Sequence, residues 1–155
     1  MSASRIKTLK SCSFLYWAKY VLKLYDTTNE GAQRGTVIHT VFECLMKPRH
    51  KHHFKAITKK GSIVASKVVS RYVETYIRKL GMSDGTFKKI DGMIMQGLNN
   101  DFFCKGGKIV GVELEFDLKS EDPLYRIMGY IDRITHYDGK FSRIQDWKSS
   151  SKPFT

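Results

Sequence analysis

Two aspartates and a lysine near the end of the chain could together bind a cation and act on a phosphate. Asp132 lies in Gly129-Tyr130-Ile131-Asp132, and the triplet Asp146-Trp147-Lys148 follows it. Two neighbouring carboxylates repel unless a counter-ion lies between them, and hard oxygen ligands suit Mg²⁺ or Mn²⁺. Such an ion polarises a phosphoryl oxygen and acidifies a water molecule, while a lysine offsets charge on the phosphate. The residues predict metal-dependent hydrolysis, and the alternative is an exposed salt-bridged hairpin.

Three predicted strands would position these groups. Apolar residues alternate with polar ones in 110–118, which indicates a half-buried strand. A second strand is predicted over 125–137, and Asp138-Gly139 is typical of a type I′ hairpin turn before a third strand over 140–148. Residues two apart on a strand share a face. We therefore expect Asp146 and Lys148 to point the same way, beside Asp132.

The first part of the chain has the spacing of helices. Apolar residues at three- and four-residue steps predict helices over 4–24, 33–46 and 63–80, and a fourth from Ser83 or Asp84 to about 103. The predicted fold class is α/β (α+β). In it, one domain over 1–155 packs a mainly helical part, 1–104, on a three-stranded antiparallel meander, 105–155.

The charge balance favours a polyanionic partner. Lysine and arginine number 27 against 15 acidic residues, which gives a net charge of +12. Nucleic acid is the leading candidate and an anionic membrane surface the weaker one. No apolar run approaches the ~20 residues that span a bilayer. Three widely spaced cysteines do not form a secreted disulfide framework, so we expect a cytoplasmic protein.

A basic stretch at 47–60 could contact phosphates, or it could be a solvated loop. The predicted nucleic-acid contacts are Arg34, Lys47, Arg49, Lys51 and Lys55. The three histidines of the stretch, at 50, 52 and 53, lack cysteine or carboxylate partners there, and no metal site is expected from them. The aromatics at 16, 17 and 20 could stack on bases, although helical spacing favours a place in the core.

Four motifs in order resemble the RecB-like exonuclease branch of the PD-(D/E)XK nuclease superfamily. Asp132 and Asp146-Trp147-Lys148 are similar to its signature aspartate and (D/E)-x-K. The other three motifs are the opening Ser2-Ala3-Ser4-Arg5-Ile6 with Cys12 and Tyr16, the helix Arg34-Gly35-Thr36-Val37-Ile38-His39 with Glu43, and the strand Gly111-Val112-Glu113 with Phe116. The motifs cover nearly the whole chain, and the sequence as a whole is most similar to the phage members of this branch.

The resemblance implies a role for each matching residue. His39, Asp132, Asp146 and the main-chain carbonyl of Trp147 would bind Mg²⁺ or Mn²⁺. Glu113, rather than its neighbour Glu115, would be the further acidic member, and Lys148 the catalytic lysine. Glu43 would either orient His39 through a hydrogen bond or act in catalysis.

The implied activity is DNA exonuclease action in phage recombination, repair or degradation, in the host cytoplasm if the chain is phage-encoded. Two alternatives stay open: a DNA-binding or assembly module that has lost turnover, and an endonuclease on the same core.

The sequence departs from the family after Lys148. The usual helix with Q-x-x-x-Y and the closing strand do not follow it. We therefore expect an incomplete PD-(D/E)XK core that a second polypeptide, a second copy or a longer chain completes. Some relatives hold an iron–sulfur cluster through one early and three late cysteines. Cys12 has the early place, but the late three are missing, so no cluster is expected and Cys12 is predicted to be a small buried residue.

Overall fold

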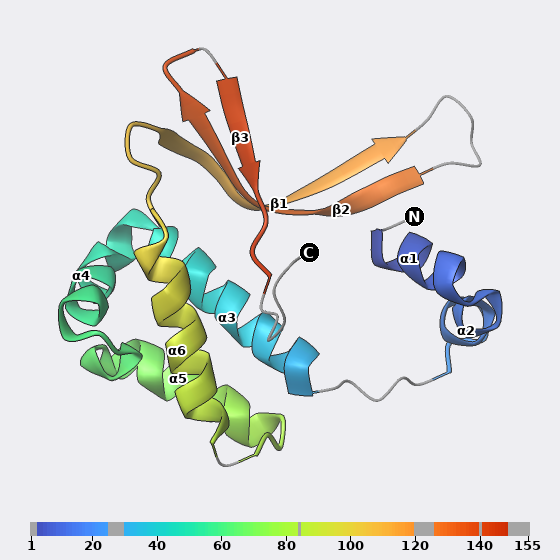
Figure 1. Ribbon diagram of the computed structural model, residues 1–155, viewed down its shortest axis with the longest axis horizontal. Coiled ribbons are helices and arrows are strands. Elements are labelled where there is room, and N and C mark those ends of the chain that lie inside the picture. The colour runs from blue at the N-terminus through green and yellow to red at the C-terminus, as the bar shows by residue number, and fades with distance from the viewer. Residues whose placement is uncertain (1–2, 25–29, 84, 120–125, 140, 149–155) are drawn as a thin grey trace.

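The computed structural model describes residues 3–24, 30–83, 85–119, 126–139 and 141–148 (Figure 1). Its α-helices are α1 (Ala3–Ser11), α2 (Ser13–Tyr16), α3 (Glu30–Met46), α4 (Lys51–Lys60), α5 (Lys67–Lys79) and α6 (Thr86–Asn99). They precede an antiparallel sheet of strand order β1-β2-β3, formed by β1 (Lys108–Lys119), β2 (Arg126–Tyr137) and β3 (Phe141–Gln145). The expected α+β class, helices first and a three-stranded meander after them, is confirmed.

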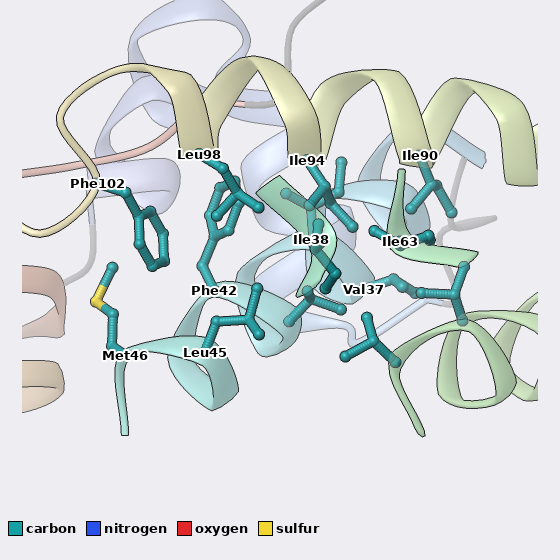
Figure 2. Packing of buried hydrophobic residues seen from close by; sticks show 14 residues of the cluster. Val37, Ile38, Phe42, Leu45, Met46, Ile63, Ile90, Ile94, Leu98 and Phe102 are labelled. Atoms are coloured by element: carbon teal, nitrogen blue, oxygen red, sulfur yellow. The ribbon is translucent and has the colours of Figure 1, made fainter. Parts of the chain in front are cut away.

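The core lies among helices α3 to α6, and α3 is also in contact with β1. Ile90, Ile94 and Leu98 repeat every four residues along α6 and point toward α3 (Figure 2). On α3 they meet a stripe of buried side chains that includes Phe42 and Leu45. Each such side chain contributes roughly 1.5–3 kcal/mol when fully buried. The core therefore holds α3 in a fixed position, and with it the residues of α3 that lie next to β1.

Gly97 lets α6 approach α3 closely. A Cβ at this position would lie 2.3 Å from Cζ of Phe42, whose ring is buried. We therefore expect Gly97→Ala to lower the free energy of unfolding by about 1–3 kcal/mol, the usual range for overpacking. Gly92 on the same helix has nothing within 4 Å of an added Cβ, so Gly92→Ala should raise it by up to about 1 kcal/mol. Urea unfolding of both variants measures the two free energies. A change in the same direction for both variants would contradict the prediction.

Glu30 joins the start of α3 to the start of α6. Its carboxylate accepts hydrogen bonds from Thr86 Oγ1 at 2.5 Å, Ser83 Oγ at 3.1 Å and Arg34 Nη1 at 3.2 Å. These bonds, the one from Thr86 above all, lower the pKa of Glu30.

A lowered pKa means that this carboxylate stabilises the fold above its unfolded pKa and that the effect is lost as the pH falls through the folded value. Glu30→Gln should therefore lower the Tm at pH 7, and the difference from wild type should shrink as the pH falls below 4.5, the ordinary value. Thermal melts across this range measure it, with the exposed Glu74→Gln on α5 as control. A pH-independent difference would contradict the assignment.

Several predicted helix boundaries were wrong. The helix expected over 4–24 is interrupted at Cys12, whose Sγ accepts a hydrogen bond from the Leu15 amide and so caps α2. A π-helical turn, Trp17–Val21, follows α2. Cys12 is exposed rather than buried, and Trp17 is 45% exposed, so the expected core placement of these residues does not hold.

The basic stretch 47–60 is helical rather than a loop. A 3₁₀ turn, Pro48–His50, leads into α4, which ends at Gly61 in the left-handed conformation. A second 3₁₀ turn, Ile63–Ala65, precedes α5, which is shorter than the predicted 63–80. Helix α6 begins at Thr86, with Ser83 just outside it, and ends at Asn99 rather than 103. Asp84, the other candidate cap, lies outside the described residues. None of the described helices is long and apolar enough to cross a membrane.

The hairpin of β1 and β2 extends beyond the helices. Its register pairs Phe116 with Gly129, and the shift between Ile109 and Gly111 marks a bulge. Asp138 and Gly139 both have positive φ, but the register pairs Tyr137 with Phe141, so three residues and not the predicted two connect β2 to β3. In the outer hairpin, residues 114–119 and 126–131, the apolar face predicted to be half-buried is largely uncovered: Leu118 is 61% exposed and its cross-strand partner Ile127 is 51% exposed.

Strand β3 is shorter than predicted. It ends at Gln145, so Asp146 and Lys148 lie after the sheet and not within a strand. The first predicted residue of β3, Lys140, and the first of β2, Tyr125, lie outside the described residues.

Candidate metal centre

Three potential cation ligands meet where α3 crosses the hairpin. His39 comes from the edge of α3, Glu113 from β1 and Asp132 from β2. His39 Nδ1 lies 3.3 Å from Asp132 Oδ1 and 3.5 Å from Glu113 Oε1, and one ligand atom from each residue lies within 4.8 Å of the others. This is the only group of three or more acidic, histidine or cysteine ligands found among the described residues.

The sheet register brings the two carboxylates together. Val112 pairs with Arg133 and Leu114 with Ile131, so Glu113 and Asp132 face each other across the two strands. Glu113 has φ +49°, in the left-handed region that a side chain rarely adopts. Such a backbone costs roughly 1–3 kcal/mol and persists where the surroundings impose it. Of the two glutamates left open by the sequence, Glu113 is in the group and Glu115 is exposed.

The neighbouring glycine of the motif has a packing role. Gly129 lies opposite Phe116, and an added Cβ would lie 2.9 Å from the ring of that phenylalanine. Two of the sequence motifs, the one with Glu113 and Phe116 and the one with Gly129 and Asp132, therefore form one cross-strand unit. The absence of a side chain at Gly129 leaves room for the Phe116 ring, on the face of the hairpin opposite to Glu113 and Asp132.

The three groups shift one another's pKa values. The hydrogen bond with Asp132 raises the pKa of His39. Burial raises the pKa of Glu113, and the Asp132 carboxylate raises it further. Burial acts in the same direction on Asp132, but hydrogen bonds from His39 and from the Trp147 amide outweigh it, and the pKa of Asp132 is lowered. A proton on His39 and a divalent cation would therefore compete for the same carboxylate oxygens.

Asp146 and Lys148 lie beside this group but not in it. The Trp147 amide donates a hydrogen bond to Asp132 Oδ2 at 2.5 Å, which ties the segment after β3 to the acidic pair. Asp146 itself forms an ion pair with Lys148, and both side chains are about half exposed. The structure thus keeps the aspartate and lysine of the triplet together, as expected, but it directs the Asp146 carboxylate to Lys148 and not to His39 and Asp132.

Arg133 holds that segment in place and was missed from the sequence. It is 1% exposed and donates to the Phe102 carbonyl and to Gln145 Oε1. Its guanidinium also lies over the Trp147 ring, 5.1 Å from the centroid. The only sequence signal was its place directly after Asp132, which puts its side chain on the other face of β2.

The predicted nucleic-acid contacts are spread over two helices and the turn between them. Arg34 is paired with Glu30, and Lys47 Nζ lies 2.6 Å from Glu43 Oε1. Glu43 thus has a lysine partner, and among the described residues no contact between Glu43 and His39 is found. Arg49 donates to His50, while Lys51 and Lys55 are exposed on α4.

The fold and this group define an α+β domain with a histidine–carboxylate site suited to a divalent cation. A family model described as the PD-(D/E)XK nuclease superfamily matches residues 1–155, and the chain belongs to that superfamily. Membership implies nuclease activity, and the nucleases of this superfamily use divalent metal ions. Searches of curated proteins and of solved structures gave no match to this chain.

Proposed function

We propose that this chain hydrolyses DNA phosphodiester bonds with Mg²⁺ or Mn²⁺, acting from an end as a RecB-like exonuclease domain over residues 1–155. The convergence of His39, Glu113 and Asp132 carries the proposal, because these ligands suit a hard divalent ion. A phage-type role in DNA recombination, repair or degradation, in the cytoplasm, follows from the motif resemblance alone.

The residues divide the work as follows. His39, Glu113 and Asp132 would hold the ion, and the Trp147 amide fixes the Asp132 carboxylate. When bound, a divalent ion supplies Lewis-acid polarisation of the phosphate and a more acidic water. We propose that Asp146 leaves Lys148 to join the ligands and that the main-chain carbonyl of Trp147 binds as well. The lysine ammonium would then stabilise charge on the phosphate.

Cleavage assays on two DNA forms test the proposal. With Mn²⁺ present, loss of linear DNA without nicking of covalently closed circular DNA supports an exonuclease, and nicking of the circle supports the endonuclease alternative. EDTA should stop either reaction. Binding of DNA without cleavage at any Mn²⁺ concentration would reject the nuclease proposal. One observation favours that non-catalytic alternative: Asp146 is paired with Lys148 and lies outside the ligand group.

We further propose that the basic residues at 34, 47, 49, 51 and 55 contact DNA phosphates. Affinity should then fall steeply with salt, by roughly 0.9 in log K per log salt for each contact with duplex DNA. Lys51→Ala with Lys55→Ala should reduce the slope by about 2. The exposed pair on α6, Lys88→Ala with Lys89→Ala, removes equal charge as a control. A slope unchanged in the first double variant would count against contacts by α4.

We also propose that a second polypeptide or a second copy of the chain covers the outer hairpin. Its exposed apolar side chains support this, since a two-stranded ribbon is marginally stable in water without a covered face. Sedimentation velocity over a concentration series would test for a second copy. A monomer at every concentration would exclude a second copy and leave a different polypeptide or a longer chain.

A further inference from the structure

A cleft opens beside His39, between α3, α6 and the segment after β3. It has a volume of about 200 Å³, and His39 and Lys148 line one part of it. Gln96 of α6 and Asn100, directly after that helix, line another, and Phe42 and Trp147 contribute aromatic surface. We propose that this cleft binds one nucleobase of the substrate, next to the phosphate held at the His39 group. The inference rests on the proposed function and names the part of the substrate that α6 recognises.

The size and walls of the cleft suit a single ring system. Pockets for drug-sized ligands begin at roughly 300 Å³, and this cleft is smaller. Trp147 supplies the accessible aromatic surface of the cleft, and the buried Phe42 ring supports it from behind, 5.3 Å away at 53°. Trp147 is only partly buried, and base–aromatic stacking is a common way to hold an unpaired base. A flat, partly polar aromatic ligand fits these features better than an aliphatic one.

Two amides at the C-terminal end of α6 supply the polar recognition. Gln96 lies on the last turn of α6 and Asn100 is the residue that follows the helix, and both line the same cleft. Both are exposed, and among the described residues no hydrogen bond to either side-chain amide is found. A carboxamide offers a donor and an acceptor side by side, which matches the edge of a base. These amides are available for a ligand.

The opening on the other side of His39 has no comparable pair of side-chain amides among its lining residues. It is lined by Thr36, Thr40 and Glu113, among others. The Thr36 hydroxyl already donates to the Ala32 carbonyl, and the Thr40 hydroxyl donates to the Thr36 carbonyl. His39 lines both openings, so a strand whose phosphate lies at His39 can extend into each. We therefore place base recognition on the α6 side.

Trp147 allows binding to be measured without any cleavage. The chain has two tryptophans, and Trp17 is exposed in the N-terminal helical segment. A Trp17→Phe protein leaves Trp147 as the single reporter in the cleft. Deoxynucleoside monophosphates should quench its fluorescence, whereas deoxyribose 5-phosphate, which lacks a base, should not.

The amides are then removed in the same background. Gln96→Ala with Asn100→Ala should weaken nucleotide binding at least about fivefold, as expected for two lost hydrogen bonds. Asn99→Ala removes a neighbouring amide of α6 that does not line the cleft and should bind as the parent does. Circular dichroism confirms that each variant is folded.

Two outcomes overturn the inference: equal quenching by the base-free sugar phosphate, or unchanged affinity in the double variant. Failure of the nuclease proposal gives a different pattern. In that case nucleotides still quench Trp147 in a base- and amide-dependent way, while DNA stays uncut.

Discussion

Asp132→Asn should abolish DNA cleavage and remove tight Mn²⁺ binding. Asp132 is the most buried of the three proposed ligands, with a side chain 8% exposed, and it contacts both His39 and the Trp147 amide. Asparagine keeps the shape but loses the charge that offsets the cation. Loss of a group that merely orients a ligand lowers metal affinity by about 10–100-fold, so loss of a ligand should exceed this. Isothermal titration with Mn²⁺ measures the affinity directly.

A matched aspartate provides the control. Asp117 lies on β1 in the outer hairpin and is paired with Arg126 at 2.6 Å, so Asp117→Asn removes one negative charge away from His39. It should leave both Mn²⁺ affinity and cleavage unchanged. If Asp132→Asn bound Mn²⁺ as the wild type does, the ion would bind elsewhere and the site proposed here would be wrong.

Lys148→Ala should abolish metal-dependent cleavage while leaving DNA binding nearly intact. The ammonium is half exposed beside the His39 cleft, so its removal should neither unfold the chain nor open the core. Removing one group placed to stabilise transition-state charge reduces turnover by about 10²–10³-fold. Single-turnover cleavage and filter binding separate the two effects.

A second exposed lysine makes the comparison specific. Lys108 begins β1, well away from Lys148 in the sequence, and Lys108→Ala removes the same charge. It should cut DNA at the wild-type rate. An active Lys148→Ala protein would remove that residue from the mechanism. Equal loss of DNA binding in both variants would point to net charge instead.

The motif order allowed the ligand group to be predicted, because each motif lies on an element with a fixed partner. His39 lies on the described helix that contributes the most buried residues to the core, and Glu113 and Asp132 lie on strands joined by antiparallel pairing. The prediction for Asp146 had no such support. Alternation suggested a strand through Lys148, but pairing with β2 ends at Gln145, and beyond it the backbone is not bound to two-residue periodicity.

Other features could not be predicted from the spacing of apolar residues, for physical reasons. Helix α4 has only two large apolar residues, Phe54 and Ile57, so its sequence resembles a solvated basic loop. A period of two tells which side chains share a face of β1, but it does not tell whether anything covers that face. Leu114 and Leu118 share the apolar face of β1, yet both are exposed. Arg133 could not be foreseen either, since its partners come from the turn after α6 and from the end of β3.

The backbone at Glu113 links the durability of this protein to its chemistry. A chain selected only to resist heat would carry glycine or asparagine there, since both tolerate the left-handed conformation. The strained backbone and the proposed metal ligand therefore fall on the same residue. Replacing Glu113 with glycine should relieve the strain and raise the Tm, and it would also remove the second carboxylate of the proposed metal site.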